Sequence, residues 1–294
     1  MKGIILAAGK GTRLYPITKS ICKPLLPVYD KPLIYYSIST LMLAGIRDIL
    51  IIIPDGQQIA FRELLGDGSK FGINIEYAIQ DVPRGIADAF IVGERFIKND
   101  QVCLMLGDNI FYHPNLEGIL KKAMRFVKNA SKATIFGIKV EDPYSFGVVE
   151  FDENGRVISI EEKPDYPKSQ YAVPGLYFYG NDVIDIAKEL KPSARGELEI
   201  TDVNIEYLNR GKLNVIPLDE EVIWLDAGTV TTLHEAACRV YEMQQIGVYV
   251  SYPEKVAIDK GYITWDKFIH EIEEMHNTEY GKHLKDMMDS IKLI

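Results

Sequence analysis

An apolar run near the start of the chain leads directly into a glycine-rich turn, in the sequence Ile4-Ile5-Leu6-Ala7-Ala8-Gly9-Lys10-Gly11-Thr12-Arg13. A buried strand that ends in Gly-x-Gly leaves backbone N–H groups free to converge on an anion, because glycine tolerates positive φ and close approach. The pattern alone is weak, since many structural turns share it. It is not a P-loop, and Leu14 replaces the third glycine of a dinucleotide-binding turn. On its own, the turn is either a phosphate loop of another kind or a structural turn.

The chain around this turn alternates between strand-like and helix-like patterns up to about residue 130. Short apolar runs bounded by Gly, Asp or Pro predict buried strands at 4–7, 49–53, 73–79 and 102–106. The stretches between them predict helices at 33–44, 59–65, 86–97 and 116–127. This spacing indicates βαβ units and a parallel sheet with helices on both faces. Such sheets bind ligands beyond the carboxyl ends of their strands.

The second half predicts more strands and then helices. Strands are expected at 133–140, 147–151, 157–160 and 176–179, with an Asn-Gly hairpin turn within 152–155. Helices are expected at 182–190, at 200–210 and from 231 onward. We therefore expect one α/β core over 1–230, in two halves of about 1–130 and 131–230. Residues 231–294 are expected to form a helical extension that is not an independent domain.

The composition is that of a folded protein. The 294 residues are 47% hydrophobic and 26% charged, which excludes disorder over most of the chain. Lys and Arg number 33 against 42 Asp and Glu, a formal net charge of −9. The acidic balance, with no basic block, argues against a nucleic-acid or anionic-membrane partner. The chain has no apolar run long enough to act as a leader or span, and its three cysteines form no C-x-x-C pair, so a cytoplasmic protein is expected.

Two cations follow the glycine turn. The sequence continues as Gly11-Thr12-Arg13-Leu14-Tyr15-Pro16, Lys23-Pro24-Leu25-Leu26-Pro27-Val28 and Lys31-Pro32-Leu33. Arg13 and Lys23 beside one glycine loop suit a triphosphate, because the leaving pyrophosphate gains charge as its bond breaks. The whole string resembles the signature of the sugar-nucleotide pyrophosphorylases, a family of nucleotidyltransferases.

Two aspartates follow strand-like runs. Asp108 comes just after the predicted strand 102–106, and Asp226 ends the run Trp224-Leu225-Asp226. Each alone could be a helix cap or a turn residue. Paired beside a phosphate loop, two carboxylates and the substrate phosphates would make an ordinary Mg²⁺ site.

The resemblance extends over essentially the whole chain and is most specific to the family of glucose-1-phosphate thymidylyltransferases. It implies a Rossmann-like, mostly parallel or mixed sheet with helices on both faces, the nucleotide-diphospho-sugar transferase fold, and a helical C-terminal extension. The matching strings, besides those above, are Leu65-Gly66-Asp67-Gly68, Gly107-Asp108-Asn109, Phe146-Gly147-Val148-Val149-Glu150-Phe151, Glu161-Glu162-Lys163-Pro164, Tyr171-Ala172-Val173 and Arg195-Gly196-Glu197-Leu198-Glu199-Ile200-Thr201-Asp202-Val203-Asn204.

The resemblance also implies a reaction and a site. A thymidylyl group would pass from dTTP to α-D-glucose 1-phosphate, giving dTDP-glucose and pyrophosphate. Arg13 and Lys23 would be catalytic, and Mg²⁺ would lie on Asp108 and Asp226. The nucleotide would contact Leu6, Ala8, Gly9, Gly11, Thr12, Arg13, Gln80, Gly85 and Asp108, with Gln80 and Gly85 reading thymine. The sugar phosphate would contact Phe146, Gly147, Glu162, Lys163, Val173 and Arg195.

Several alternatives stay open at this point. Ala8 and Pro24 are also common in relatives that use UTP or CTP, so a UTP-using or relaxed-specificity enzyme is the main alternative. A non-catalytic sugar-nucleotide sensor on the same fold and a nicotinamide dehydrogenase are weaker ones. The resemblance further implies a homotetramer and the first step of dTDP-L-rhamnose-type sugar synthesis.

Overall fold

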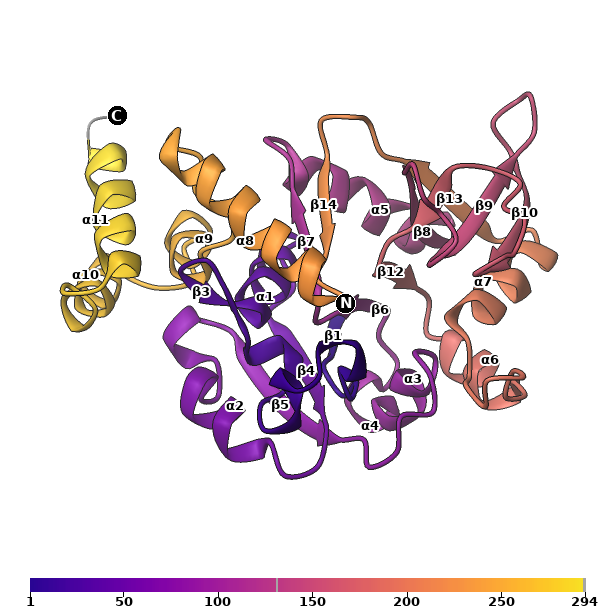
Figure 1. Cartoon of the computed structure of the whole chain (residues 1–294), viewed down its shortest axis with the longest axis horizontal. Coiled ribbons are helices and arrows are strands. Elements are labelled where there is room, and N and C mark those ends of the chain that lie inside the picture. The colour runs from indigo at the N-terminus through magenta and orange to yellow at the C-terminus, as the bar shows by residue number, and fades with distance from the viewer. Residues whose placement is uncertain (131, 293–294) are drawn as a thin grey trace.

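The computed structural model describes residues 1–130 and 132–292, so Leu293 and Ile294 of the expected extension lie outside the described residues. A ten-stranded mixed sheet runs through the described chain (Figure 1). The structure confirms the predicted α/β class. In spatial order the strands are β10 (Val157–Glu162), β9 (Gly147–Phe151), β11 (Tyr171–Val173), β8 (Ala133–Lys139), β12 (Leu176–Tyr179), β6 (Val102–Leu106), β1 (Lys2–Leu6), β4 (Asp48–Ile53) and β5 (Asn74–Ile79), with β13 (Leu213–Pro217) paired to β8.

The strands β6, β1, β4 and β5 are parallel, as the sequence predicts. β1 lies between β4 and β6, so that Ile4 is opposite Leu50 on one side and Leu104 on the other. The chain continues from β1 to β4 in one direction and reaches β6 on the other side. A parallel sheet opens a ligand crevice at this reversal of strand order, beyond the carboxyl ends of the strands.

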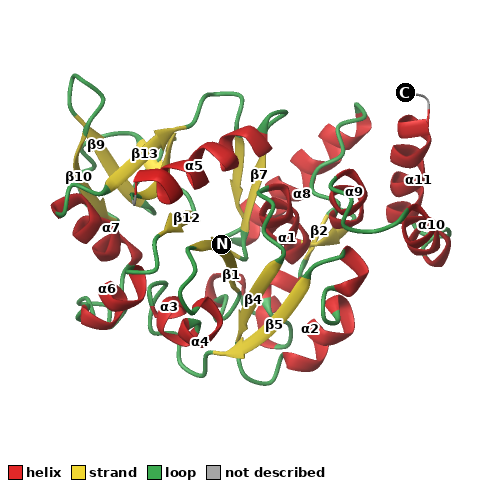
Figure 2. Ribbon diagram, turned by 180° about the vertical axis from the view of Figure 1, so that it is seen from behind, coloured by secondary structure: helices red, strands yellow, loops and turns green. Residues whose placement is uncertain are grey.

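Helices cover both faces of the sheet, and each face has its own apolar core (Figure 2). Neighbouring residues of β1 serve opposite cores, because side chains alternate along a strand: Ile5 belongs to one and Ile4 to the other. The first core is covered by α1 (Leu33–Leu43), α2 (Gln58–Leu65), α5 (Leu116–Ala130) and the C-terminal helices α9 (Pro253–Asp259), α10 (Trp265–Glu274) and α11 (Glu279–Lys292). The second is covered by α3 (Asp88–Val92), α4 (Glu94–Ile97), α6 (Val183–Glu189) and α7 (Ile200–Asn209).

The single helix predicted over 86–97 is wrong in one respect, because the structure divides it at Gly93 into α3 and α4. Gly93 lies so close to β1 that a Cβ there would be 2.8 Å from Cδ1 of Ile4. The break lets Phe90 and Phe96 both pack on the sheet. The predicted Asn-Gly hairpin is confirmed: Gly155 has φ of 75° and β9 pairs antiparallel with β10.

Short pairings that the sequence did not reveal complete the fold. The most important is a two-stranded ribbon of β7 (Asn109–Tyr112) and β14 (Ile223–Asp226), which joins segments more than 100 residues apart. A smaller hairpin is formed by β2 (Pro27–Val28) and β3 (Lys31–Pro32). The 3-10 helices are η1 (Thr12–Leu14), η2 (Ile17–Lys19), η3 (Lys23–Leu25) and η4 (Ser69–Phe71).

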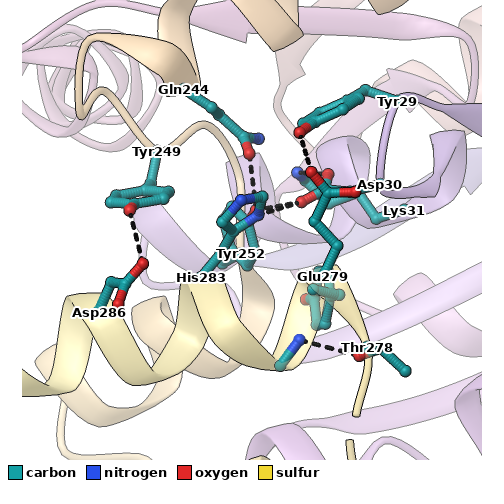
Figure 3. Close-up of polar contacts among 12 residues, drawn as sticks. Tyr29, Asp30, Lys31, Gln244, Tyr249, Tyr252, Thr278, Glu279, His283 and Asp286 are labelled. Atoms are coloured by element: carbon teal, nitrogen blue, oxygen red, sulfur yellow. Dashed lines mark hydrogen bonds and ion pairs between the residues drawn. The ribbon is translucent and has the colours of Figure 1, made fainter. Parts of the chain in front are cut away.

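The C-terminal helices begin with α8 (Val230–Gln245) and end with α11, at the opposite end of the molecule from β9 and β10 (Figure 1). α11 docks on the turn between β2 and β3 through polar contacts (Figure 3). The Tyr29 hydroxyl donates to Oε1 of Glu279 over 2.6 Å, and Nδ1 of His283 lies 2.9 Å from Oδ2 of Asp30. Among the described helices, none has the length and apolarity needed to cross a bilayer.

Candidate active site

A pocket of about 410 Å³ opens at the carboxyl ends of β1 and β6, where the strand order reverses. It lies at the position that the parallel sheet predicts. Most of the site residues expected from the sequence line it, although they come from widely separated segments. These are Leu6, Gly9, Gly11, Thr12, Arg13, Lys23, Asp108, Phe146, Gly147, Glu162, Lys163, Val173 and Asp226.

The glycine turn after β1 forms one wall of the pocket. Gly11 has φ of 59°, and the hydroxyl of Thr18 donates to its carbonyl over 2.6 Å. A Cβ on Gly11 would lie 3.1 Å from Cγ2 of Thr18, so glycine serves both the left-handed backbone and the close packing. A Cβ on Gly9, by contrast, would meet nothing within 4 Å, which leaves its backbone open to a ligand. The turn thus lines the pocket with accessible backbone, and its role as a phosphate loop stays a prediction.

Arg13 reaches from η1 towards the second carboxylate of the site. Its Nη2 lies 3.2 Å from the position that a Cβ on Gly228 would occupy, and Oδ2 of Asp226 lies 2.7 Å from the same point. A side chain at residue 228 would therefore collide with both groups. Glycine at that position lets a guanidinium and a carboxylate approach one wall of the pocket.

Lys23 and Asp108 form a close ion pair in the pocket. Nζ of Lys23, on η3, is 2.5 Å from Oδ2 of Asp108, and the side chain of Lys23 is only 9% exposed. Asn109 donates from Nδ2 to Oδ1 of Asp108 over 2.8 Å. Burial by itself would raise the pKa of Asp108, but the Lys23 charge and these hydrogen bonds keep that pKa below its usual value. Asp108 is therefore a carboxylate at neutral pH.

The β7–β14 ribbon brings Asp226 to Asp108. Asp226 ends β14 and is paired with Asn109, and the Ala227 N–H donates to the carbonyl of Asp108 over 3.1 Å. Burial, followed by the negative charge of Asp108, raises the pKa of Asp226 to about 6. The two predicted carboxylates thus face one pocket and repel each other.

These two carboxylates form a donor set that suits Mg²⁺. Among the described residues no group of three or more His, Cys, Asp or Glu side chains could hold a metal. A cation at Asp108 and Asp226 would need further oxygen ligands from phosphates and water, as is usual for Mg²⁺. The mutual repulsion that raises the pKa of Asp226 is also what a divalent cation would relieve.

Asn109 connects three elements of the site, a role that the sequence did not predict. Its Oδ1 accepts hydrogen bonds from the Gly175 N–H over 2.9 Å and from Nε1 of Trp224 over 2.7 Å, while its Nδ2 reaches Asp108. The side chain is buried. Asn109 therefore fixes the carboxylate, the β14 strand and the loop before β12 relative to one another.

The far wall of the pocket carries Glu162 at the end of β10, followed by Lys163. Oε2 of Glu162 accepts from the hydroxyl of Thr201, and its Oε1 is 3.2 Å from Nη2 of Arg195. Lys163 has φ of 44°, an uncommon backbone for a residue other than glycine. A carboxylate with two nearby cations can accept hydroxyl groups and also leave a positive charge for a phosphate.

Four expected site residues do not line the pocket. Ala8 is buried and belongs to one of the two cores. Nη2 of Arg195 contacts Oε2 of Glu199 over 2.8 Å and Oε1 of the lining residue Glu162 over 3.2 Å. Gly85 precedes the lining residue Ile86, whereas Gln80 is buried and bonds to Asp88.

The pocket also includes residues that the sequence analysis did not assign to the site. Asn109 and Trp224 could have been suspected, because each lies within two residues of a predicted carboxylate. Ala7, Pro24 and Gly107 also adjoin predicted site residues, whereas residues such as Gly175 and Tyr177 reach the pocket through the pairing of β12 with β6. The unassigned lining residues are Ala7, Pro24, Ile86, Leu106, Gly107, Asn109, Ser145, Gly175, Tyr177, Glu197, Ile200, Thr201, Trp224 and Gly228.

The chain is similar to known proteins in both sequence and structure. The family model described as Nucleotidyl transferase matches residues 2–243. The chain is 53% identical over 285 residues to a glucose-1-phosphate thymidylyltransferase of Neisseria gonorrhoeae, covering 97% of this chain and 98% of the relative. It is 52% identical over 291 residues to the enzyme of the same name from Mycolicibacterium smegmatis, covering 98% and 99%.

A solved structure has a similar fold. It is a 2.76 Å crystal structure from Bacillus anthracis, assigned as a glucose-1-phosphate thymidylyltransferase and complexed with sucrose. The TM-score is 0.75 at 44% sequence identity, and the match covers 81% of this chain and 94% of that one.

Proposed function

The chain belongs to the nucleotidyl transferase family, and on that premise we propose that it transfers a thymidylyl group from dTTP to α-D-glucose 1-phosphate, releasing pyrophosphate. The observation that carries the proposal is the grouping of Arg13, Lys23, Asp108 and Asp226 around one pocket at the strand-order reversal. Two cations beside a glycine turn suit a triphosphate, and two carboxylates suit its metal.

We propose an in-line displacement without a covalent enzyme intermediate. An oxygen of the sugar phosphate attacks the α-phosphorus of dTTP, and the bond to the β-phosphate oxygen breaks. Arg13 and Lys23 stabilise the negative charge that grows on the leaving pyrophosphate. Glu162 accepts hydrogen bonds from the glucose hydroxyls, and backbone groups of Gly147 and Val173 also bond to these hydroxyls. Lys163 attracts the sugar phosphate, with added positive charge from Arg195, which pairs with Glu162.

Mg²⁺ is the cofactor that we propose, held by Asp108 and Asp226. When bound it would neutralise phosphate charge and help to orient the triphosphate. The ammonium of Lys23 can then interact both with Asp108, 2.5 Å away, and with a triphosphate in the pocket that Lys23 lines. In the division of labour that we propose, residues of about 1–130 bind the nucleotide and residues of about 131–230 bind the sugar phosphate.

A UTP-using or relaxed-specificity enzyme is the second candidate. Pro24 lines the pocket and lies beside Gly107, where a Cβ would be 3.3 Å from its Cγ. Pro24 cannot donate a side-chain hydrogen bond to a base or a sugar, so it offers no discrimination of its own.

The experiment that tests the function is pyrophosphate release from glucose 1-phosphate, with dTTP, UTP, CTP, ATP and GTP assayed separately in Mg²⁺. Turnover is expected with dTTP and is expected to stop when EDTA removes the metal. A preference for UTP would move the assignment to the second candidate. Binding of dTDP-glucose without turnover of any nucleotide would instead indicate a sensor.

We further propose a cytoplasmic homotetramer that acts at the start of dTDP-L-rhamnose-type sugar synthesis. The support is the family resemblance. Sedimentation or gel filtration over a range of concentrations tests the assembly, and a monomer at every concentration would contradict it.

A further inference from the structure

Gln80 and Asp88 form a buried hydrogen-bonded pair next to the carboxyl end of β5. Gln80 follows β5 directly and is 5% exposed, whereas Asp88, the first residue of α3, is fully buried. Nε2 of Gln80 donates to Oδ2 of Asp88 over 2.6 Å. The other carboxylate oxygen of Asp88 lies 2.8 Å from Nη2 of Arg84. A carboxylate only accepts hydrogen bonds, so the Gln80 amide must turn its nitrogen towards Asp88.

The rest of the Gln80 amide is available to a ligand. Among residues 1–130 and 132–292, Oε1 of Gln80 has no hydrogen-bond partner. It is nevertheless not one of the polar atoms in these residues that are completely buried without a partner. An amide nitrogen carries two hydrogens, and Asp88 takes one of them. The pair therefore presents one acceptor and one donor in a fixed order. Gln80 lies at the carboxyl ends of the parallel strands, the edge at which the pocket opens, and Ile86, two residues before Asp88, lines the pocket although Gln80 and Asp88 do not.

The fixed order matches one class of base edge. Thymine and uracil present an N3–H donor beside a carbonyl acceptor, which pairs with the Oε1 acceptor and the free Nε2 donor. Cytosine presents an N3 acceptor beside an amino donor, which would require the amide to turn over. A turned amide would bring Oε1 against Oδ2 of Asp88, so that two acceptors face each other in a buried place.

We propose that Asp88 is a specificity-determining positioning residue, which locks the Gln80 amide in the orientation that accepts an imide base and rejects an aminopyrimidine. This inference rests on the proposed function. It assigns no contact with the nucleotide to Asp88 itself. The discrimination arises because the buried carboxylate penalises the alternative orientation of its neighbour.

The test is Asp88→Asn, a nearly isosteric change. An asparagine can donate or accept, so it supports either orientation of the Gln80 amide. The ratio of kcat/KM for dTTP to that for dCTP is expected to fall by at least ~10-fold, since a polar site discriminates strongly only while its groups are fixed. The ratio for dTTP to dUTP is expected to stay within a factor of ~2, because both bases present the same imide edge.

Two controls make the outcome specific. Arg84→Gln removes the exposed partner of Asp88 and leaves the carboxylate, so its base ratios should match those of the wild type. Asp88→Ser, which also donates or accepts, replaces the asparagine variant if the latter fails to fold. An equal loss of kcat/KM with dTTP and dCTP would overturn the inference while leaving the proposed function standing. Absence of dTTP turnover in the wild type would overturn the proposed function instead.

Discussion

We expect loss of the positive charge of Lys23 to reduce the rate of the reaction strongly. Its ammonium is nearly buried and faces both Asp108 and the pocket. Lys23→Met keeps the apolar stem and removes the charge. We expect kcat/KM for dTTP to fall by ~10²-fold or more, the scale observed when one electrostatic stabiliser of a transition state is lost. Pyrophosphate release at saturating Mg²⁺ measures the effect.

The matched control for this variant is Lys122→Met, which removes a lysine charge from the exposed surface of α5. It should retain wild-type turnover. Thermal denaturation of Lys23→Met belongs with the assay, because the change leaves the carboxylate of Asp108 without its cation. Normal turnover by a folded Lys23→Met protein would mean that Lys23 is not a catalytic residue.

At this scale the sequence predicted the charged residues of the site but not their supports. Arg13 and Asp108 follow parallel strands whose carboxyl ends meet at one edge, whereas Asp226 reaches that edge through the antiparallel β7–β14 ribbon. The bond from Trp224 to Asn109 joins residues 115 positions apart. It depends on the pairing of β7 with β14, which no local pattern encodes.

At the scale of elements, the turn at Gly85 packs closely against the backbone of Leu198, just before α7. Gly85 has φ of 104°, and a Cβ on it would lie 2.3 Å from the carbonyl oxygen of Leu198. Gly85→Ala is therefore expected to displace the turn and raise the KM for dTTP by ~10-fold or more, as misplacement of a binding element does. Steady-state kinetics with dTTP varied at saturating glucose 1-phosphate measure this change.

Gly155→Ala is the control for backbone strain alone. Gly155 also has positive φ, 75°, but a Cβ there would meet nothing within 4 Å. This variant should lose about 1 kcal/mol of unfolding free energy, the usual cost of a left-handed alanine, with the KM for dTTP unchanged. An unchanged KM in Gly85→Ala would mean that the turn does not position the nucleotide.

Elements with strong periodicity were predicted well, whereas those defined by contacts were not. Strands β1, β4 and β6 are mostly apolar and buried, typical of strands covered on both faces, whereas the edge strand β5 contains Asn74 and Glu76 and is partly exposed. The break at Gly93 follows from its close approach to Ile4 of β1, which local pattern does not include. Short strands such as β11 and β13 exist because a neighbouring strand pairs with them.

At the scale of the whole molecule, the C-terminal segment packs on a buried ion pair in the turn between β2 and β3. Asp30 and Lys31 have side chains that are 2% and 0% exposed, with 2.7 Å between Oδ1 and Nζ. Nζ of Lys31 also lies 3.9 Å from the ring centre of Tyr252, whose hydroxyl donates to Asp30 (Figure 3). Residues of the extension over 231–292 therefore contact the β2–β3 hairpin directly.

Asp30→Asn is expected to lower the free energy of unfolding by ~3–5 kcal/mol at neutral pH, because it leaves the Lys31 ammonium buried without its anion. Burial alone would raise the pKa of Asp30, but Lys31 and hydrogen bonds from Tyr252 and His283 hold that pKa below its usual value. The stabilisation is therefore complete above about pH 3.9 and is lost as pH falls through the lower folded pKa. Urea denaturation measures both effects.

The control for Asp30→Asn is Asp259→Asn, which breaks the half-exposed pair between Lys255 and Asp259 on α9. A pair of this kind should cost less than about 1 kcal/mol. Equal losses of stability in the two variants would contradict the special role of the buried pair.

Lys31 provides a second pH dependence, of the same sign but in an alkaline range. Burial lowers the pKa of Lys31 to about 8, although Asp30 and Glu254 act to raise it. Between about pH 8 and the unfolded pKa of about 10.4, the unfolded chain holds a proton that the folded chain has released, so stability contributed at this residue rises with pH. Subtracting the unfolding free energy of Lys31→Met from that of the wild type isolates this contribution, since all other groups are shared. The difference should be constant from pH 6.5 to 7.5 and should grow from pH 8 to 10. A difference that stays flat to pH 10 would mean that Asp30 keeps Lys31 charged throughout, and the C-terminal segment would then pack on a permanent ion pair.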